Sequence, residues 1–559
     1  TGNDKSGYIN KGTIDVYGGT KIAPITGMNV AFGMAQNVSD GSDVAKLKVD
    51  HGYGIYATDA SNIKNTGKIE VTGMLTQLST MRLNGGESAE TVPSGNNYAI
   101  VGISDTDAVD YNVNENGIGT INTLNIEQSG ADGEIKVEGD LAVGIYGENR
   151  NNALASDIKI KYDDSARTSA GIDVSNTNVT SSDARGVGIA LVNKSSTNYI
   201  NGWNRAGGEL TLKGFGGTLG QFGASHNNIL TGKNGVGVYA ESAEIKVDSD
   251  DFTVETKDNG VGLWAMDDTV IARGADHDKT FQYNYNGAND KRGFAMAFGG
   301  KNTDSGYTTA SNYMDIKFSN RGDNNKQLNL QKEATLPATS GTTKGIAGIL
   351  VNTNDAGDRV INKGHIEEHK SSVTNLRAYG AVVNKGTFEN WGDIKLNESL
   401  MPAKASDVKT ADMKKVNVGI MANDHSANAR YNTYIENYGD ITIGDVKDGA
   451  NSANQDKNIG SWAIYGYNIK TGAKADGTDV TFKINRNSYG IYSGDGNVDI
   501  QKGTVLKVGN DTVLGHVPHD QVVDGVNYPI RRQTQYSDAD DLLSGLDTPR
   551  ERDSAIGVY

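Results

Sequence analysis

The chain has 559 residues, of which 71 are glycine, 7 are proline and none is cysteine. The lack of cysteine excludes disulfide bridges, thiolate metal sites and cysteine nucleophiles, and the glycines follow no Gly-X-Y period, which excludes collagen. With 53 Lys and Arg against 69 Asp and Glu, the formal charge is −16, which argues against nucleic acid as a partner because that binding depends on basic side chains.

Self-similarity dominates the chain from its first residues to its last. One motif is glycine, an aliphatic residue, any residue, and then a small or aliphatic residue. Copies begin at Gly54, Gly144, Gly188, Gly237, Gly262, Gly348, Gly380, Gly419 and Gly490, and the last residues are Gly557-Val558-Tyr559. Such repetition points to a repeat architecture and not to the three or four separate domains that the length alone would suggest.

A second motif is Asn-x-Gly-x-Ile. Its copies begin at Asn10, Asn65, Asn362, Asn390 and Asn437. Because Asn and Gly tolerate positive φ, we interpret each copy as a tight turn. The residues that follow alternate apolar and polar, as in Ile69-Glu70-Val71, so each turn is expected to lead into a short strand with one buried face.

The spacing of the motifs predicts how the strands are arranged. Successive first motifs lie 25 residues apart between Gly237 and Gly262 and 32 apart between Gly348 and Gly380, so two or three strands fill each period. This length favours an all-β fold, a right-handed parallel β-helix (solenoid) with projecting loops, in which each strand pairs with its equivalent one coil along. A tandem array of β-sandwiches is the competing architecture.

Intervals that exceed one period predict where loops interrupt the helix. We expect a parallel β-helix over residues 1–509, with loop insertions at about 198–234, 274–292, 301–343 and 401–416. Residues 510–553 break the pattern and contain Pro518, Pro529 and Pro549, so they are expected to form an irregular inserted subdomain, with a short helix at 538–543. Residues 554–559 then resume the coil.

Motifs that could carry catalysis or metal binding are weak. His365-Ile366-Glu367-Glu368-His369 matches the zinc-protease pattern H-x-x-E-H, but that pattern needs a helix. On a strand, residues four apart lie about 13 Å apart, too far to share one zinc ion. His516 and His519 flank Pro518 and are expected to be polar side chains on the surface and not metal ligands. We therefore predict no metal site and no cofactor.

Some parallel β-helix proteins are polysaccharide hydrolases, lyases or serine proteases, so we searched the sequence for their catalytic motifs. Asn302-Thr303-Asp304 is similar to the first motif of polygalacturonases, whose chemistry needs two carboxylates close together. The later pair Asp540-Asp541 is far away in the sequence, and neither Gly-His-Gly nor the serine-protease motif Gly-Asp-Ser-Gly occurs. The sequence therefore predicts no catalytic residues.

Candidate ligand contacts lie in the expected loops. Trp203, Phe281, Tyr283 and Tyr285 could stack on sugar rings or anchor a protein partner, and the alternative is that they cover the core at coil edges. Arg321, Gly322 and Asp323 form an integrin-type Arg-Gly-Asp tripeptide, which in a chain rich in all three residues can also arise by chance.

Units such as Gly-Ile-Tyr-Ala and Ile-Asn-Lys-Gly-Thr-Ile, with no cysteine and an acidic composition rich in Gly and Asn, resemble the passenger domain of type V autotransporters. The pattern of these short repeat units is most similar to that of the large fusobacterial outer-membrane autotransporter adhesins. The resemblance implies a signal peptide and a C-terminal translocator β-barrel in the full protein, and that membrane anchoring occurs only through this barrel, which is absent from the chain. We expect the chain to be a fragment of a longer passenger.

The expected function is that of a non-catalytic adhesin on the surface of a Gram-negative bacterium. Its loops would bind proteins or glycans of host cells or partner bacteria, as in virulence and coaggregation. Two alternatives remain open: a polysaccharide-degrading β-helix hydrolase or lyase, and a biofilm module that self-associates laterally.

Overall fold

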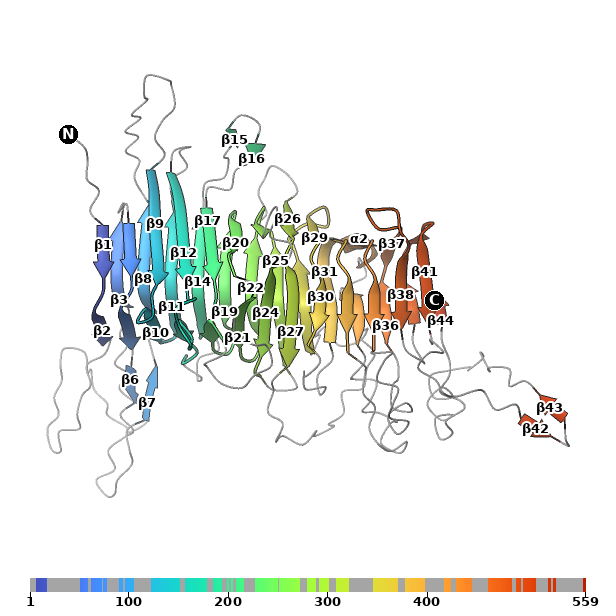
Figure 1. Cartoon of the computed structure of the whole chain (residues 1–559), viewed down its shortest axis with the longest axis horizontal. Coiled ribbons are helices and arrows are strands. Elements are labelled where there is room, and N and C mark those ends of the chain that lie inside the picture. The colour runs from blue at the N-terminus through green and yellow to red at the C-terminus, as the bar shows by residue number, and fades with distance from the viewer. Residues whose placement is uncertain are drawn as a thin grey trace, which may run out of the picture. The chain divides into compact units, whose positions relative to one another are not determined.

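The computed structural model of the chain is shown in Figure 1. The described residues are 7–17, 51–58, 62–72, 74–77, 90–93, 96–104, 122–150, 156–177, 184–193, 199–200, 203–204, 208–215, 227–249, 251–271, 279–287, 291–300, 308–320, 345–369, 378–397, 417–423, 429–444, 461–484, 489–493, 496–508, 521–523, 526–528 and 556–558. Contacts divide the chain into two compact units, Thr1–Trp264 (unit 1) and Ala265–Tyr559 (unit 2).

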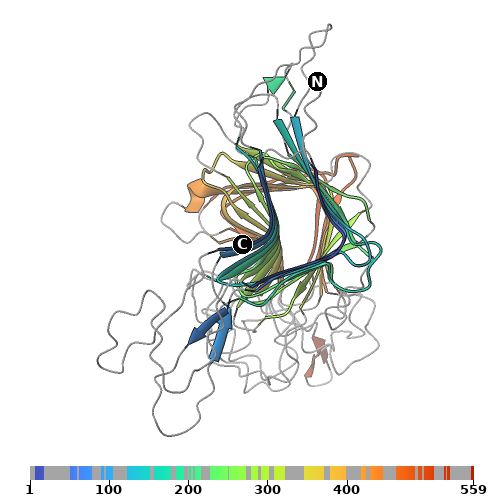
Figure 2. The ribbon, with the colours of Figure 1, turned by 90° about the vertical axis from the view of Figure 1, so that its left-hand side faces the viewer.

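Each unit is a parallel β-helix, which confirms the predicted fold class. A coil runs through one strand in each of three sheets, which we call the first, second and third sheet, and each strand pairs in parallel with its equivalent in the next coil. Seen along the coils (Figure 2), the strands form walls around an interior that the inward side chains fill. Each coil therefore repeats the same three-sided path.

The strands of unit 1 form these three sheets and two antiparallel hairpins. The first sheet contains β3 (His51–Thr58), β8 (Asn96–Ser104), β11 (Leu141–Asn149), β14 (Arg185–Asn193), β19 (Val236–Glu241) and β22 (Gly260–Met266). The second contains β1 (Gly7–Asn10), β4 (Asn62–Asn65), β9 (Asn122–Ser129), β12 (Ser156–Asp163), β17 (Gly208–Lys213) and β20 (Glu244–Val247). The third contains β2 (Thr13–Tyr17), β5 (Lys68–Thr72), β10 (Glu134–Glu138), β13 (Ile172–Val174), β18 (Ile229–Thr231) and β21 (Asp251–Thr256). Two antiparallel hairpins stand outside them, β6 (Met74–Gln77) with β7 (Glu90–Pro93) and β15 (Tyr199–Ile200) with β16 (Trp203–Asn204).

Unit 2 repeats the arrangement, with β31 (Ala378–Asn390) long enough to serve both the first and the second sheet. The first sheet also contains β25 (Arg292–Gly299), β28 (Gly345–Asn352), β33 (Val418–Ala422), β36 (Trp462–Gly466), β39 (Tyr489–Ser493) and β44 (Ile556–Val558). The second contains β23 (Val270–Ile271), β26 (Thr309–Asn312), β29 (Arg359–Asn362), β34 (Thr433–Asn437), β37 (Asn468–Thr471) and β40 (Val498–Ile500). The third contains β24 (Thr280–Tyr285), β27 (Asp315–Asn320), β30 (Ile366–Glu368), β32 (Ile394–Leu396), β35 (Ile441–Ile443), β38 (Val480–Ile484) and β41 (Thr504–Val508). Outside them are the short helix α2 (Ala429–Asn432) and the hairpin of β42 (Gln521–Val523) with β43 (Val526–Tyr528).

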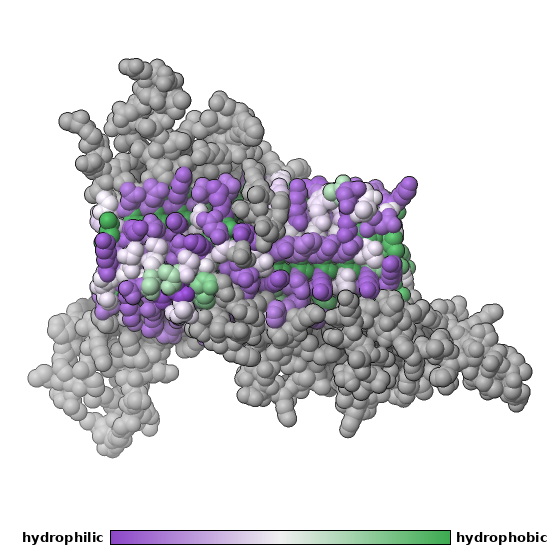
Figure 3. All heavy atoms as spheres, in the orientation of Figure 1, coloured by the Kyte–Doolittle hydropathy of each residue, from purple (hydrophilic) through white to green (hydrophobic). Residues whose placement is uncertain are grey.

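The core of each unit is a set of aliphatic columns along the coils. In the third sheet of unit 1, Ile69 pairs with Ile135, which pairs with Ile172, and all three side chains are fully buried. In unit 2 the corresponding column includes Ile394 and Ile441. Burial of stacked aliphatic side chains is the main favourable term in folding. The outer surface is different, because hydrophilic residues cover most of the visible face of the coils (Figure 3).

The glycine of the first motif meets the isoleucine of the second motif across this core. A Cβ built on Gly380 would lie 2.5 Å from Cγ2 of Ile394 and 2.5 Å from the Gly419 carbonyl oxygen of the next coil. Gly419 has the same relation to Ile441, at 2.7 Å. The two sequence motifs are therefore the two sides of one contact, repeated coil after coil.

At the tight turn of the second motif, the main chains of successive coils lie in close contact. The glycine of this motif does not have the conformation that we expected from the sequence. None of Gly67, Gly364, Gly392 and Gly439 adopts the positive φ that we expected. Instead, a Cβ at Gly392 would lie 1.8 Å from the Gly364 carbonyl oxygen, and one at Gly439 would lie 2.0 Å from that of Gly392. Glycine is required because the main chains of successive coils touch at this turn.

The asparagine of the second motif forms a buried ladder. The Asn390 amide donates to the Gly392 carbonyl oxygen at 2.7 Å and to Asn437 Oδ1 at 2.8 Å, while it accepts from Asn362 Nδ2 at 2.8 Å. The same pattern joins Asn10 to Asn65 in unit 1. Because both amide hydrogens are used, each asparagine closes its own turn and fastens it to the next coil.

Three of the four expected loops contain strands of the coil. The range 198–234 includes β17 and β18, 274–292 includes β24, and 301–343 includes β26 and β27. These ranges are therefore only partly insertions, whereas 401–416 lies outside the described residues. Within 510–553 the structure describes the β42–β43 hairpin, and the helix expected at 538–543 lies outside the described residues. β44 returns to the first sheet by pairing with β39. In the described part of the chain, no helix is both long and apolar enough for a membrane span.

Candidate functional site

A cluster of aromatic and charged side chains lies at the end of the second sheet in unit 2. We call it the second-sheet patch and define it as Arg359, Glu389, Trp391, Glu436 and Tyr438. The in-register pairing of β29, β31 and β34 places Glu389 beside Glu436 and, one residue past each Asn, Trp391 beside Tyr438. The patch therefore follows directly from the coil register.

A closed network of polar contacts fixes these side chains. Trp391 Nε1 donates to Glu389 Oε1, and the Tyr438 hydroxyl donates to Glu436 Oε2 at 3.1 Å. The Arg359 guanidinium joins the two carboxylates, because it contacts Glu389 and lies 3.3 Å from Glu436 Oε2. Burial opposes the charge on Arg359, but the hydrogen bond and attraction of Glu389 outweigh it and raise the pKa of Arg359. The patch is therefore held in place before any ligand arrives.

The two rings of the patch are stacked. The ring centroids of Trp391 and Tyr438 lie 4.3 Å apart with 23° between the planes. Burial raises the pKa of the Tyr438 hydroxyl, so it stays neutral and able to donate at physiological pH. Lys470 Nζ lies 6.0 Å from the Tyr438 ring centroid, within reach of a cation–π contact. Stacked, partly exposed rings with fixed polar neighbours are suited to hold a flat ligand.

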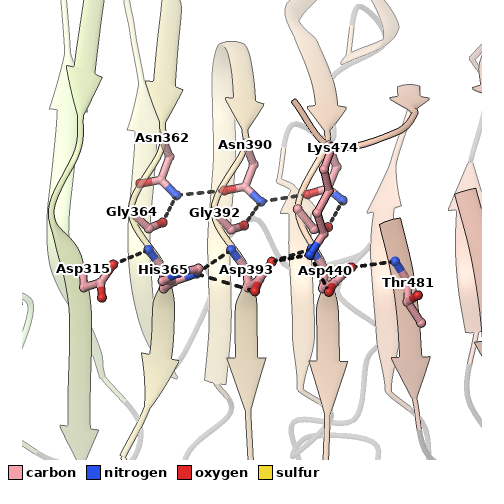
Figure 4. Close-up of polar contacts among 12 residues, drawn as sticks. Asp315, Asn362, Gly364, His365, Asn390, Gly392, Asp393, Asp440, Lys474 and Thr481 are labelled. Atoms are coloured by element: carbon pink, nitrogen blue, oxygen red, sulfur yellow. Dashed lines mark hydrogen bonds and ion pairs between the residues drawn. The ribbon is translucent and has the colours of Figure 1, made fainter. Parts of the chain in front are cut away.

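A row of polar side chains runs beside the asparagine ladder, three residues after each asparagine (Figure 4). The main-chain N–H of His365 donates to Asp315 Oδ1 at 2.7 Å, that of Asp393 to His365 Nδ1 at 3.0 Å, and that of Asp440 to Asp393 Oδ1 at 3.0 Å. Lys474 Nζ lies 2.7 Å from Asp440 Oδ2 and 3.4 Å from Asp393 Oδ1. These carboxylates are therefore engaged in joining coils.

The corners between sheets differ in how much chain they carry. Between the second and third sheets the turn is only Trp391 to Asp393 in one coil and Tyr438 to Asp440 in the next. Between the third sheet and the first sheet of the next coil, the connection is short in some coils, as at 139–140 and 485–488, whereas long segments intervene in others. In unit 2 these run over 321–344, 369–377, 397–417, 444–461 and 509–555, and in unit 1 over 18–50 and 73–95. We call this edge the third-to-first corner.

The aromatic residues proposed from the sequence on β24 do not form a ligand site. Tyr283, Tyr285 and Phe281 are each fully buried, and β24 pairs with β27 in the third sheet. Their side chains fill the core, as the alternative interpretation allowed, because β24 is a coil strand and not a loop. They are not available for contact with a ligand.

The other proposed contacts cannot be placed in a site. Trp203 belongs to the β15–β16 hairpin, where Ile200 pairs with Trp203, and its side chain is outside the described part of the structure. Arg321, Gly322 and Asp323 lie outside the described residues, as do Asn302-Thr303-Asp304, Asp540-Asp541, His516 and His519.

The H-x-x-E-H segment is located as the repeat predicted. Ile366–Glu368 forms strand β30, with His365 and His369 at its two ends. Burial lowers the pKa of His369, whose main-chain N–H donates to the Phe318 carbonyl oxygen at 2.8 Å. Among the described residues, no group of three or more His, Cys, Asp or Glu side chains could hold a metal ion.

Sequence reasoning missed Trp391 and Tyr438, although a signal was present. They occupy the variable position of two consecutive Asn-x-Gly-x-Ile copies, Asn390-Trp391-Gly392 and Asn437-Tyr438-Gly439. In a solenoid, equal motif positions in consecutive copies lie side by side. Comparing the variable positions along the repeat would have identified the stacked pair.

Comparison with known proteins gave no relative for this chain: no protein-family model, no curated protein and no solved structure matches it. The fold and the second-sheet patch therefore carry the functional argument.

Proposed function

We propose that this chain is part of a non-catalytic bacterial cell-surface adhesin, a passenger segment of the autotransporter type. Its β-helix would serve as a scaffold, and the segments inserted at the third-to-first corner would contact proteins or glycans of another cell. In this proposal the chain acts outside the cell, on the surface of a Gram-negative bacterium.

The observation that carries the proposal is the contrast between the corners. In the coils of the Asn ladder, the second-to-third corner is closed by the ladder and by main-chain contact at Gly392 and Gly439, and its turns have only three residues, whereas the same corner holds 214–228 in unit 1. In unit 2 the third-to-first corner carries a connection of nine or more residues in five coils, with shorter ones at 286–291 and 485–488. Binding residues concentrate on segments that a rigid scaffold positions, and repeat proteins gather their insertions on one face.

The scaffold itself is suited to mechanical and chemical exposure. Each coil is fastened to its neighbours by main-chain pairing, buried aliphatic columns and the Asn ladder. Ion pairs across coils, such as Lys64 with Glu127 at 3.0 Å and Lys246 with Glu209 at 3.1 Å, add to this on the outside. None of these contacts depends on a disulfide bridge, since the chain has no cysteine.

Attachment of protein-coated beads to epithelial cells and to other bacteria would test the proposal. We expect the intact chain to attach, and attachment to fall when residues 321–344 or 445–460 are replaced by a short Gly-Ser linker. Replacement of 105–121, which follows the first sheet in unit 1, is the matched control and should leave attachment unchanged. Attachment that was equal for all three variants, or absent for the intact chain, would contradict the proposal.

A further inference from the structure

The turn position of Trp391 and Tyr438 forms a column of side chains along unit 2. In successive coils it is occupied by Tyr313, Lys363, Trp391, Tyr438, Gly472 and Gln501, each one residue past a registered pair of the second sheet. The side chains touch in pairs, since Lys363 Nζ lies 4.9 Å from the Tyr313 ring centroid and Trp391 stacks on Tyr438. The column then reaches Gly472, which contributes no side chain.

Gly472 contributes no side chain to its layer of the column beside Tyr438, and the Gln501 amide extends into that layer. A Cβ built there would lie 3.4 Å from Tyr438 Cε1 and 3.1 Å from Gln501 Oε1. One coil spacing is about 4.8 Å, close to the distance at which a ring stacks on an aromatic face. Trp391 covers one face of Tyr438, so the other face is directed to the layer of Gly472, into which the Gln501 amide reaches from the next coil.

The groups around this layer are polar. Lys470 hydrogen-bonds the Tyr438 hydroxyl, which raises the pKa of Lys470. Asp499 accepts from Gln501 Nε2 at 3.0 Å, and Glu436 accepts from the Tyr438 hydroxyl. Amide, ammonium and carboxylate groups match the hydroxyls of a sugar, which can both donate and accept hydrogen bonds. A sugar ring also has an apolar C–H face that can stack on an aromatic ring.

We propose that Tyr438 is the stacking platform of a saccharide-binding site. One sugar ring of a neutral glycan occupies the layer over Gly472, displaces the Gln501 amide, and receives hydrogen bonds from Lys470 and Gln501. Glu389, Glu436 and Arg359 hold the stacked rings in position and so reduce the entropy lost on binding. The site is on the coil itself, so it does not depend on the segments at the third-to-first corner.

Binding of the whole chain to an array of immobilised neutral oligosaccharides, followed by titration calorimetry with a bound glycan, tests this site. Gly472→Tyr is the most informative variant, because Gly472 has no positive φ and a ring there would complete the column. We expect it to reduce affinity roughly tenfold or more while the coil stays folded, and Tyr438→Ala to reduce affinity by a similar factor. Tyr434→Ala removes an exposed tyrosine of β34 outside the proposed site and should leave affinity unchanged.

Two outcomes would overturn the site: no neutral glycan bound by the intact chain, or a folded Gly472→Tyr variant that binds as tightly as the unsubstituted chain. Because the two variants act in opposite ways, one by adding a ring and the other by removing it, either alone decides the question if the other fails to fold. A chain that binds glycans but does not attach to cells would uphold this site and reject the proposed adhesion.

Discussion

Gly392 lies against Gly364 of the preceding coil so closely that a Cβ at Gly392 would be 1.8 Å from the Gly364 carbonyl oxygen. Gly392→Ala must therefore push two coils apart at the tight turn. We expect a loss of unfolding free energy of about 1–3 kcal/mol, the usual cost of overpacking a close contact. Chemical denaturation, followed by hydrogen exchange at the Ile394 and Ile441 amides, measures it.

Gly12 offers the matched control for this substitution. It holds the same motif position, but a Cβ there would have no atom within 4 Å. Gly12→Ala should leave stability unchanged or slightly raised, since alanine restricts the unfolded chain. Equal destabilisation by both substitutions would show that main-chain contact between coils is not the reason for the glycine.

Because the Asn ladder connects coils, a substitution in one coil should also destabilise the neighbouring coils. Asn390→Ala removes one member and leaves the Asn362 amide, the Asn437 Oδ1 atom and the Gly392 carbonyl each without one hydrogen bond. Each unpaired buried group costs about 1–3 kcal/mol. We expect faster hydrogen exchange in β30, β32 and β35 together, whereas Asn384→Ala, in an exposed ladder, should affect exchange only locally.

If Asn390→Ala sped up exchange only within its own turn, the ladder would be a set of independent turns and not a connection between coils. The spread of the effect, and not its size, is thus the informative quantity.

The buried carboxyl group of Asp164 should make the stability of unit 1 depend on pH. Burial raises the pKa of its carboxyl from 3.8 to about 6, in spite of hydrogen bonds from Asn228 and the nearby Arg167. Because the folded pKa is above the unfolded one, the stability from this group is fully present below pH 3.8 and is lost as the pH rises through about 6. The shift corresponds to about 3 kcal/mol.

Asp164→Asn should therefore flatten the melting temperature of unit 1 between pH 4 and 7. The neighbouring Asp163 is the control of opposite sign, because hydrogen bonds from Ser165 outweigh burial and lower its pKa. Its contribution is present above the unfolded pKa and lost as the pH falls. A melting profile of Asp164→Asn that kept the original slope would exclude Asp164 as its source.

The positive charge of Arg359 should stabilise the second-sheet patch by separating two carboxylates. Arg359→Met leaves the registered carboxylates of Glu389 and Glu436 facing each other without the shared cation. We expect destabilisation near pH 7 that diminishes as the pH falls and the carboxylates gain protons. Lys395→Met, which removes an exposed ion pair with Glu367 at 3.8 Å, should change stability by less than about 1 kcal/mol. Similar effects of the two substitutions would contradict the network.

How much could be predicted from the sequence depended on whether the motif itself carried the information. The period of the Gly-Ile-Tyr-Ala units and the alternation after Asn-x-Gly predicted the parallel β-helix, because apolar columns require a regular coil. The positive φ predicted for Gly392 was wrong, because this position requires glycine for main-chain contact with a residue of another coil. Tyr283 and Tyr285 were assigned to a loop because β24 lacks the motifs, although it continues the third sheet.

The second-sheet patch could be predicted only in part. Trp391 and Tyr438 occupy one motif position, so their stacking follows from the repeat. Arg359 is different, because it reaches Glu436 two coils away, and that distance depends on where each strand begins after an irregular connection. Such spacing is not encoded in any local pattern.

Both proposals, the binding segments at the third-to-first corner and the saccharide site, depend on the register of the coils. Because the chain has no cysteine, this register can be tested directly with pairs of introduced cysteines. Lys395 and Thr442 are registered neighbours on β32 and β35, and Lys483 lies one further coil along on β38. Neighbouring coils are about 4.8 Å apart, within disulfide reach, and alternate coils are about twice as far. Mass spectrometry after mild oxidation should find a disulfide in Lys395→Cys/Thr442→Cys and free thiols in Lys395→Cys/Lys483→Cys. A disulfide in the second variant, or none in the first, would contradict the register on which the account depends.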